Sequence, residues 1–302
     1  LADLEFIFTQ PSINWIALSF VRKAEDVQDL ITRTQAAGHT AKVLAKIEKP
    51  EAIKNIDAII KVSNGIMVAR GDLGVEMPIQ LLPHVQKEII QKCMQWARPV
   101  IVATQMMESM MTNPSPTRAE TTDVANAVLD GADAVMLSGE TASGKHPVTV
   151  VEYMSRIVQE TEKYYHETIA PRRPQPNKKA RTYLSDMVCF KAGAIAEEIG
   201  AKGVVGMTTS GYTGFKVSSF RPNCSIFIFS DQPNMLATMN LCWGVQCFYY
   251  DRFTTTDETI SDTTEILKGS GFVQQGDIIV NTGAMPIEKR YRTNMLRITL
   301  VD

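Results

Sequence analysis

The chain has 302 residues, of which 44% are hydrophobic and 21% are charged. This composition is typical of a globular protein and excludes a disordered or collagen-like chain. Lysine and arginine number 31 against 33 aspartates and glutamates, a net charge of -2, so no overall field attracts nucleic acid or an anionic membrane. Because one core rarely extends over about 300 residues, the length predicts about two domains.

The sequence shows no sign of export or of a membrane span. No apolar run approaches the roughly 20 residues that cross a bilayer, and the opening residues carry acids rather than the lysines of a signal peptide. Five cysteines without a CxxC pair indicate reduced thiols, and the four histidines lie far apart. We therefore expect a cytoplasmic protein without nucleic-acid or membrane partners, zinc or disulfides, in which carboxylates hold any metal.

In the first half of the chain, short apolar segments alternate with stretches of helical period. The predicted strands are Trp15–Phe20, Val43–Ile47, Gly65–Ala69, Pro99–Ala103 and Ala134–Leu137. Strands separated by helices predict a parallel sheet, and their continuous apolar runs indicate that both faces are covered. Helix starts are expected at residues 23–26, at Pro83 and after Thr121–Asp123.

A proline-rich segment divides the chain. A long helix is expected over Val148–Ile169, and the following residues 171–180, which begin PRRPQPNKK, predict a linker. Beyond it the alternation resumes, with a helix over Asp186–Ile199 and three strands. Those strands are Gly203–Met207, Ser225–Ser230 and Asp277–Asn281. The predicted domains are residues 1–170 and a smaller α/β domain over residues 181–302.

Five parallel strands fit either an open doubly wound sheet or part of a closed eight-stranded barrel. Composition does not decide between the two. Polar or charged residues end every predicted strand of the first half in turn, and a barrel collects all its strand ends around one mouth. This pattern favours the barrel.

Lys46 and Glu48 end a buried strand and project to the same side, because side chains two apart in a strand share a face. They could form an ordinary surface ion pair. Alternatively, the lysine stabilises negative charge that develops in a reaction, and the carboxylate binds a divalent ion.

The segment Arg70-Gly71-Asp72 follows the next strand. Glycine lets a ligand approach the backbone, so the N–H groups of Gly71 and Asp72 could bind a carboxylate or phosphate, although an ordinary turn would look alike. Together with Glu48, the carboxylate of Asp72 fits the oxygen coordination of Mg²⁺ when substrate and water supply further ligands.

Thr104 and Ser138 follow two more strands. Ser138 could simply cap a helix, with Glu140 completing the cap. The nearby methionines are predicted to fill the core from a helix. They are Met106, Met107, Met110 and Met111.

In the second half, a hydroxyl-rich loop over Thr208–Gly214 follows a strand and begins a helix. Backbone N–H groups at a helix start, with hydroxyls beside them, form a phosphate cradle in physical terms. The loop has no P-loop lysine, and a serine/threonine-rich turn with a helix cap is the alternative. The cations of a later segment could add charge if they fold over the loop. They are Lys289, Arg290 and Arg292.

Taken together, several segments resemble the pyruvate kinase family. They read SFVRKAEDV, AKIEKPEAI, SNGIMVARGDLGVEMP, ATQMMESM, NPSPTRAETTDVANAVLDGADAVMLSGETASGKHP and TNMLR. The resemblance implies that residues up to about 170 are the last five strands of a (β/α)8 TIM barrel and that the rest is a C-terminal α/β regulatory domain. It also implies that the first three barrel strands and a lid domain are absent, so we expect this chain to be inactive alone.

The same resemblance assigns roles to the strand-end residues. Catalysis would rest on Lys46, Thr104 and Ser138, and the substrate carboxylate on Gly71, Asp72 and Thr104. Glu48 and Asp72 would bind Mg²⁺ or Mn²⁺, and the full-length protein would also use K⁺. The implied reaction transfers a phosphoryl group from phosphoenolpyruvate to ADP, giving pyruvate and ATP in glycolysis, by an allosteric homotetramer.

The loop over Thr208–Thr213 matches the family's effector-phosphate loop. Its implied phosphate-binding residues are Thr208, Thr209, Ser210, Gly211 and Thr213. Two other hypotheses stay open: a non-catalytic polypeptide that keeps the effector-binding and assembly surfaces, and another Mg²⁺-dependent barrel enzyme acting on pyruvate-like substrates, such as a C–C lyase.

Overall fold

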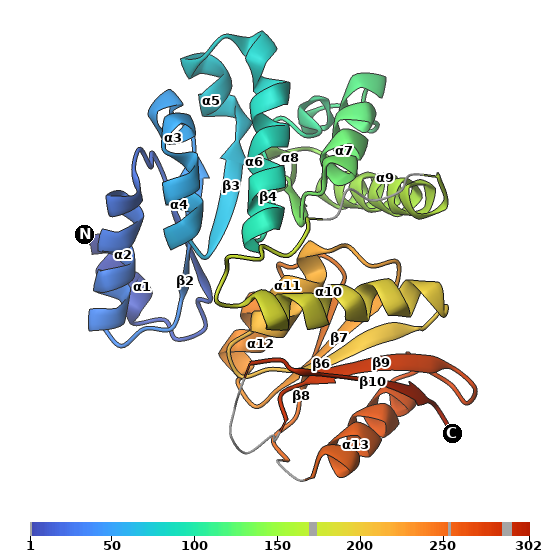
Figure 1. Ribbon diagram of the computed structural model, residues 1–302. Helices are drawn as coiled ribbons and strands as arrows, with labels where there is room; N and C mark the ends of the chain where they lie inside the picture. Colours follow the sequence, from blue (N-terminus) through green and yellow to red (C-terminus); the bar gives the residue numbers. More distant parts are fainter. Residues whose placement is uncertain (1, 169–173, 253–254, 286–291) are drawn as a thin grey trace. The chain divides into compact units, whose positions relative to one another are not determined.

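The computed structural model describes residues 2–168, 174–252, 255–285 and 292–302. The chain divides into two compact units, Leu1–Arg172 and Arg173–Asp302, each built around one sheet (Figure 1). The exact boundaries of the predicted linker, residues 171–180, stay a prediction, because residues 169–173 lie outside the described part of the chain.

The sheet of the first unit has five parallel strands in sequence order, β1-β2-β3-β4-β5. The strands are β1 (Trp15–Leu18), β2 (Lys42–Ile47), β3 (Gly65–Ala69), β4 (Val100–Ala103) and β5 (Ala134–Met136). Register pairs Ile47 with Val68, and Ala103 with both Ala69 and Met136. The carboxyl ends of β2 to β5 therefore lie at one edge.

Helices connect these strands (Figure 1). The α-helices of the first unit are α1 (Ala2–Phe8), α2 (Ala24–Ala36), α3 (Pro50–Lys54), α4 (Ile56–Val62), α5 (Arg70–Glu76), α6 (Leu82–Trp96), α7 (Arg118–Asp130), α8 (Gly139–Ala142) and α9 (Pro147–Thr168), and the 3-10 helices are η1 (Ile79–Leu81) and η2 (Glu108–Met111).

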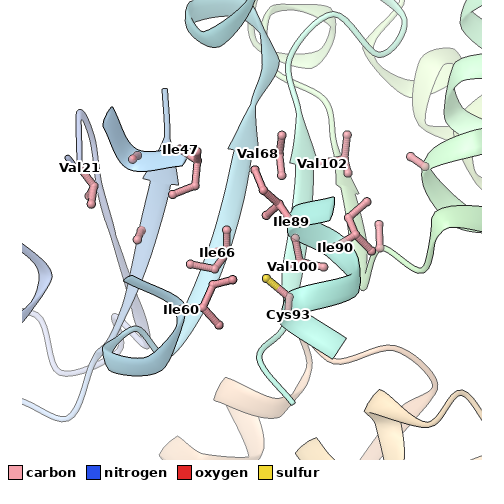
Figure 2. Close-up of a cluster of buried hydrophobic side chains, with 14 of the residues drawn as sticks. Val21, Ile47, Ile60, Ile66, Val68, Ile89, Ile90, Cys93, Val100 and Val102 are labelled. Atoms are coloured by element: carbon pink, nitrogen blue, oxygen red, sulfur yellow. The ribbon is translucent and has the colours of Figure 1, made fainter. Parts of the chain in front are cut away.

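The core of the first unit lies between the sheet and its helices. Figure 2 shows side chains of α6 beside side chains of β3 and β4. The α6 residues are Ile89, Ile90 and Cys93, and the strand residues are Val68, Val100 and Val102. The helix residues fall on one side because positions i, i+1 and i+4 lie close on a helical surface. All residues of β3 and β4 are buried, so these two central strands hold the unit together.

Apart from shifts of one residue at the ends of other elements, three expectations for the first unit differ from the structure. Strand β1 ends at Leu18, two residues early, because Phe20 adopts a left-handed backbone with φ of 56°. Helix α7 begins at Arg118, ahead of the expected start, because Thr117 and Glu120 form a capping box. The methionines lie at a 3-10 helix rather than an α-helix, although Met106, Met107 and Met110 are fully buried as predicted.

The second unit has a mixed sheet of order β10-β9-β6-β7-β8. Its strands are β6 (Gly203–Met207), β7 (Ser225–Ser230), β8 (Val245–Tyr249), β9 (Ile278–Gly283) and β10 (Met295–Leu300). Four strands are parallel, and β10 is antiparallel to β9. Neither of the edge strands, β8 and β10, is among the strands predicted from the sequence.

Helices pack on both faces of this sheet. They are α10 (Tyr183–Glu198), α11 (Tyr212–Ser219), α12 (Pro233–Met239) and α13 (Thr256–Gly269). Alternate residues of β7 divide between two cores: Ile226 and Ile228 join the cluster with α10, α11 and α12, whereas Phe227 and Phe229 join the cluster with α13. This two-sided packing fits an α/β domain with its own cores.

Across the described ranges, no helix has a segment both long and apolar enough to cross a bilayer. All five cysteines fall within those ranges and none of them is in a disulfide, and burial raises the pKa of the Cys93 thiol well above its usual value. This thiol is therefore protonated at neutral pH and a poor nucleophile.

Candidate functional site

Lys46 and Glu48 form an ion pair at the end of β2. The Lys46 Nζ atom lies 2.7 Å from Glu48 Oε1 and donates to Ser19 Oγ at 2.9 Å. Glu48 is 1% exposed, so the interpretation as a surface ion pair is wrong. The backbone N–H of Phe20 donates to the other oxygen, Oε2, at 2.7 Å. Both oxygens of this buried carboxylate thus have positive or donor groups beside them.

Thr104 contacts the backbone after β3. Its hydroxyl accepts the N–H of Gly71 at 2.7 Å and lies 2.6 Å from the carbonyl of Ala103, to which it donates. A Cβ atom on Gly71 would sit 3.4 Å from that hydroxyl oxygen. The structure therefore brings together two of the predicted substrate-binding residues, Gly71 and Thr104.

The backbone at the end of β4 is strained. Thr104 and Gln105 have φ of 70° and 51°, in the left-handed region that side chains, β-branched ones above all, disfavour. Such conformations persist where surrounding contacts hold them, and they concentrate at functional sites.

Arg70 supplies those contacts. Its buried guanidinium donates to the carbonyl of Thr104 at 2.8 Å and to that of Gln105 at 3.2 Å, and it pairs with Asp123 of α7 at 2.6 Å. In the sequence, Arg70 stood out only as part of a glycine-rich segment. The available signal was an arginine placed directly after a fully buried strand, where a charge needs partners.

Ser138 is held by a carboxylate rather than acting as a cap. Glu140 is 3% exposed, and its two oxygens accept the backbone N–H of Ser138 at 2.8 Å and of Met107 at 3.2 Å. Ser138 occupies the N-cap position of α8, but its side chain makes no capping hydrogen bond. The capping interpretation of the Ser138 hydroxyl is therefore wrong, whereas Glu140 ties the loops after β4 and β5 together.

The two predicted metal ligands lie at neighbouring strand ends. Glu48 follows β2, and Asp72 is exposed in the first turn of α5, which follows β3. Within the part of the chain that is described, no three His, Cys, Asp or Glu side chains gather into a metal site. Two carboxylates fit a hard divalent cation whose other ligands are substrate and water oxygens, so the residues suit Mg²⁺ or Mn²⁺ held jointly with a ligand.

The second unit contains a cavity of about 750 Å³ at the carboxyl edge of its sheet. The loop after β6 lines it, as do Asp231 after β7, the first turns of α13, and Arg292. Hydroxyl side chains dominate the loop and the α13 side; they are Thr208, Thr209, Ser210, Thr213, Thr255, Thr256, Thr259 and Thr263. The predicted phosphate loop thus faces a space large enough for a small metabolite.

The loop residues differ in how free their polar groups are. Thr209 and Ser210 are exposed, but Thr208 accepts the Gly211 N–H at 2.9 Å and the Thr213 hydroxyl pairs with that of Thr293 at 2.7 Å. Gly211 has φ of 81°, a conformation suited to glycine. The exposed hydroxyls of Thr209 and Ser210 are the most accessible donors of the loop.

A buried carboxylate supports the start of α11. Asp186 is 3% exposed and accepts hydrogen bonds from the Tyr212 and Thr182 hydroxyls, and Lys216 Nζ lies 3.3 Å away. Burial, followed by the charge of Asp186, raises the pKa of Cys189 to about 12. This network fixes Tyr212 in the cavity wall and was missed from sequence.

Two family models match the chain. Residues 1–151 match the pyruvate kinase barrel domain, and residues 186–299 match the pyruvate kinase alpha/beta domain. The chain belongs to the pyruvate kinase family. The predicted fold class, a partial TIM barrel followed by an α/β domain, is thereby confirmed, as is the resemblance on which it rested.

Individual pyruvate kinases agree with this assignment. The chain is 41% identical to that of Clostridium acetobutylicum over 293 residues, covering 96% of this chain and 61% of the relative. It is 40% identical to that of Lactobacillus delbrueckii, covering 49% of that relative. A crystal structure of a pyruvate kinase from Cryptosporidium parvum superposes with a TM-score of 0.87 at 33% identity, covering all of this chain and 62% of that one. The chain thus spans about half to three fifths of these pyruvate kinases.

Proposed function

We propose that the strand-end residues of the first unit form part of a phosphoryl-transfer site, acting on phosphoenolpyruvate and ADP to give pyruvate and ATP. The observation that carries the proposal is the arrangement of Lys46, buried Glu48 and the Gly71–Thr104 contact at neighbouring strand ends of a pyruvate kinase barrel. Phosphoryl transfer depends on positioning and charge neutralisation more than on covalent help, and this site offers both.

Each residue has a proposed part in the reaction. Lys46 lies where it can neutralise charge on the phosphoryl group in transit and on the enolate oxygen that the substrate develops. The N–H groups of Gly71 and Asp72, with the Thr104 hydroxyl, orient the substrate carboxylate. Thr104 and Ser138 lie at adjacent strand ends and line the path of the proton that reaches the enolate carbon. Glu48 and Asp72 would hold Mg²⁺ or Mn²⁺, and the bound ion would neutralise phosphate charge.

A coupled assay with lactate dehydrogenase tests this proposal. It is run with Mg²⁺ on the 302-residue chain and on the longest polypeptide that its gene encodes. We expect Mg²⁺-dependent turnover of the longest polypeptide and none of the 302-residue chain alone. If the longest polypeptide also fails to turn over, the proposal is wrong and a non-catalytic binding role replaces it.

Lys46→Met should lower kcat by orders of magnitude and leave the KM for phosphoenolpyruvate nearly unchanged, because the lysine acts on charge that develops during transfer. Lys54→Met, on the exposed end of α3, is the matched control and should behave as wild type. A near-normal kcat in Lys46→Met would remove this lysine from the chemistry.

We propose a regulatory role for the second unit, in which a phosphorylated small molecule binds the Thr208–Thr213 loop. The 750 Å³ cavity beside the exposed Thr209 and Ser210 supports this role. Ser210→Ala should weaken binding of the phosphorylated compound in calorimetric titration. The family resemblance further suggests K⁺ as a second cofactor and a homotetramer, which light scattering would test.

A further inference from the structure

The cavity of the second unit has an acidic side. Asp231 follows β7 and lines the cavity, and its Oδ1 atom is buried without a hydrogen-bond partner among the described residues. A buried carboxylate oxygen without a donor is unfavourable. A ligand group that donates a hydrogen bond at this point would satisfy it.

Sheet pairing places this carboxylate beside the phosphate loop. Met207 of β6 pairs with Phe229 of β7 in parallel register, so Thr208 and Asp231, one and two residues further on, leave the same edge of the sheet. The cation Arg292 also lines the cavity but belongs to the segment that leads into β10, which is separated from β7 by the two strands β9 and β6. The cavity is therefore more positive toward β10 and more negative toward β7.

Helix α13 adds to the negative side. Its N-terminal N–H groups could attract an anion, but Glu258 already brings a negative charge to this helix start: the Glu258 carboxylate accepts the backbone N–H of the N-cap residue Thr255 at 3.1 Å and the Thr255 hydroxyl at 3.0 Å. Glu258 and Thr259 both line the cavity. A second phosphate at this end would meet two carboxylates, whereas a polyol would meet an unpaired acceptor and several hydroxyls.

We propose that Asp231 is a specificity determinant of this cavity: it accepts a hydrogen bond from a hydroxyl of a polyol monophosphate and repels a second phosphate group. The inference rests on the proposed effector site, because the single phosphate is the group that binds the Thr208–Thr213 loop. Asp231 thus selects among phosphorylated ligands by the group at the far end of the molecule from the bound phosphate: it favours a hydroxyl there and disfavours a second phosphate.

Calorimetric titration of the whole 302-residue chain tests this proposal. The probes are ribose 5-phosphate, glucose 6-phosphate, fructose 1,6-bisphosphate and AMP, at pH 8, where each phosphate is close to fully ionised. We expect at least one sugar monophosphate to bind tenfold or more tightly than the bisphosphate. Asp231→Asn, which keeps the size of the side chain, should reduce this ratio at least fivefold, both by weakening the monophosphate and by strengthening the bisphosphate.

Asp251→Asn is the matched control, because Asp251 is an exposed carboxylate just beyond β8 and does not line the cavity. It should leave the ratio unchanged. Any one of three results overturns the role of Asp231. These are equal or tighter binding of the bisphosphate to wild type, tighter binding of AMP than of both sugar monophosphates, and an unchanged ratio in Asp231→Asn. If bisphosphate binding is still weakened by Ser210→Ala, the effector site survives that result. If none of the four compounds binds below millimolar concentration, the effector site and the role of Asp231 are rejected together.

Discussion

The loop after β4 is held between two buried charges. Arg70 donates to the carbonyls of Thr104 and Gln105, and Glu140 accepts the N–H of Met107 a few residues further on. The backbone of Thr104, Gln105 and Met107 is thus fixed by side chains that follow β3 and β5. This arrangement explains why two non-glycine residues can keep left-handed backbones there.

Arg70→Met should destabilise the first unit by about 2–4 kcal/mol. The change leaves two carbonyls without their charged donor, and each such loss typically costs about 1–3 kcal/mol. Urea unfolding followed by circular dichroism measures the difference. Arg156→Met is the control, since this guanidinium is exposed in its pair with Glu152 and should contribute about 0.5 kcal/mol or less. Equal losses in the two variants would show that Arg70 does not hold the loop.

Residue spacing predicted some of these contacts and missed others. The two-residue spacing of Lys46 and Glu48 predicts a shared side, and the structure shows their ion pair. The partnership of Arg70 with Asp123 joins residues 53 positions apart in sequence. Periodicity and local motifs carry no information about such separations, so only the fold reveals this pair.

The start of helix α7 is held by hydrogen bonds to Glu120 in its first turn. Burial of Glu120 would raise its pKa, but hydrogen bonds from Ser109 and Thr117 outweigh this effect and lower it. Glu120 thus joins the start of α7 to the beginning of η2 through Ser109, at 2.7 Å from the backbone N–H and 2.5 Å from the hydroxyl.

The lowered pKa predicts a pH dependence of stability. A carboxylate with a depressed folded-state pKa stabilises the fold above its unfolded pKa, about 4.3, and loses this contribution as the pH falls through the folded value. Glu120→Gln should therefore be less stable than wild type at pH 7, with the difference shrinking below about pH 4.3. Urea midpoints from pH 7 to pH 3 measure this trend. A constant difference over that range would contradict it.

The elements themselves were unevenly predictable. For the buried parallel strand β3, the predicted bounds agree with the structure, because a continuous apolar run between helical stretches has few other interpretations. The edge strands β8 and β10 were missed, since their segments VQCFY and MLRITL mix polar and apolar residues. Because β10 is antiparallel to β9, no helix separates the two strands, and the alternation of strands and helices in the sequence does not predict β10.

The segment between the two units contains exposed lysines at which trypsin could cut. Lys178 and Lys179 are exposed and lie outside the helices and strands, ahead of α10. Each unit has its own buried clusters, so each side of such a cut keeps its core.

Limited trypsin treatment should therefore cut first within residues 171–179 and leave a resistant fragment that extends to Asp302. We expect this fragment to outlast the first unit, whose edge strands β1 and β5 are less buried than β3 and β4. Mass spectrometry of the products identifies the cut. Replacing both lysines with glutamine should slow cleavage after positions 178 and 179 without affecting other sites. Longer survival of the first unit would reverse the predicted order of stability.

The hydroxyl of Thr104 bears on how a ligand would enter the first unit. It already accepts the Gly71 N–H and donates to the carbonyl of Ala103. A carboxylate that takes over this N–H therefore replaces one hydrogen bond by another instead of adding one. The number of hydrogen bonds is then unchanged, but the new acceptor is charged where the old one was neutral, and charge-assisted hydrogen bonds are the stronger kind. Calorimetry should therefore find a favourable enthalpy of ligand entry that comes from the charge of the acceptor and not from an added hydrogen bond.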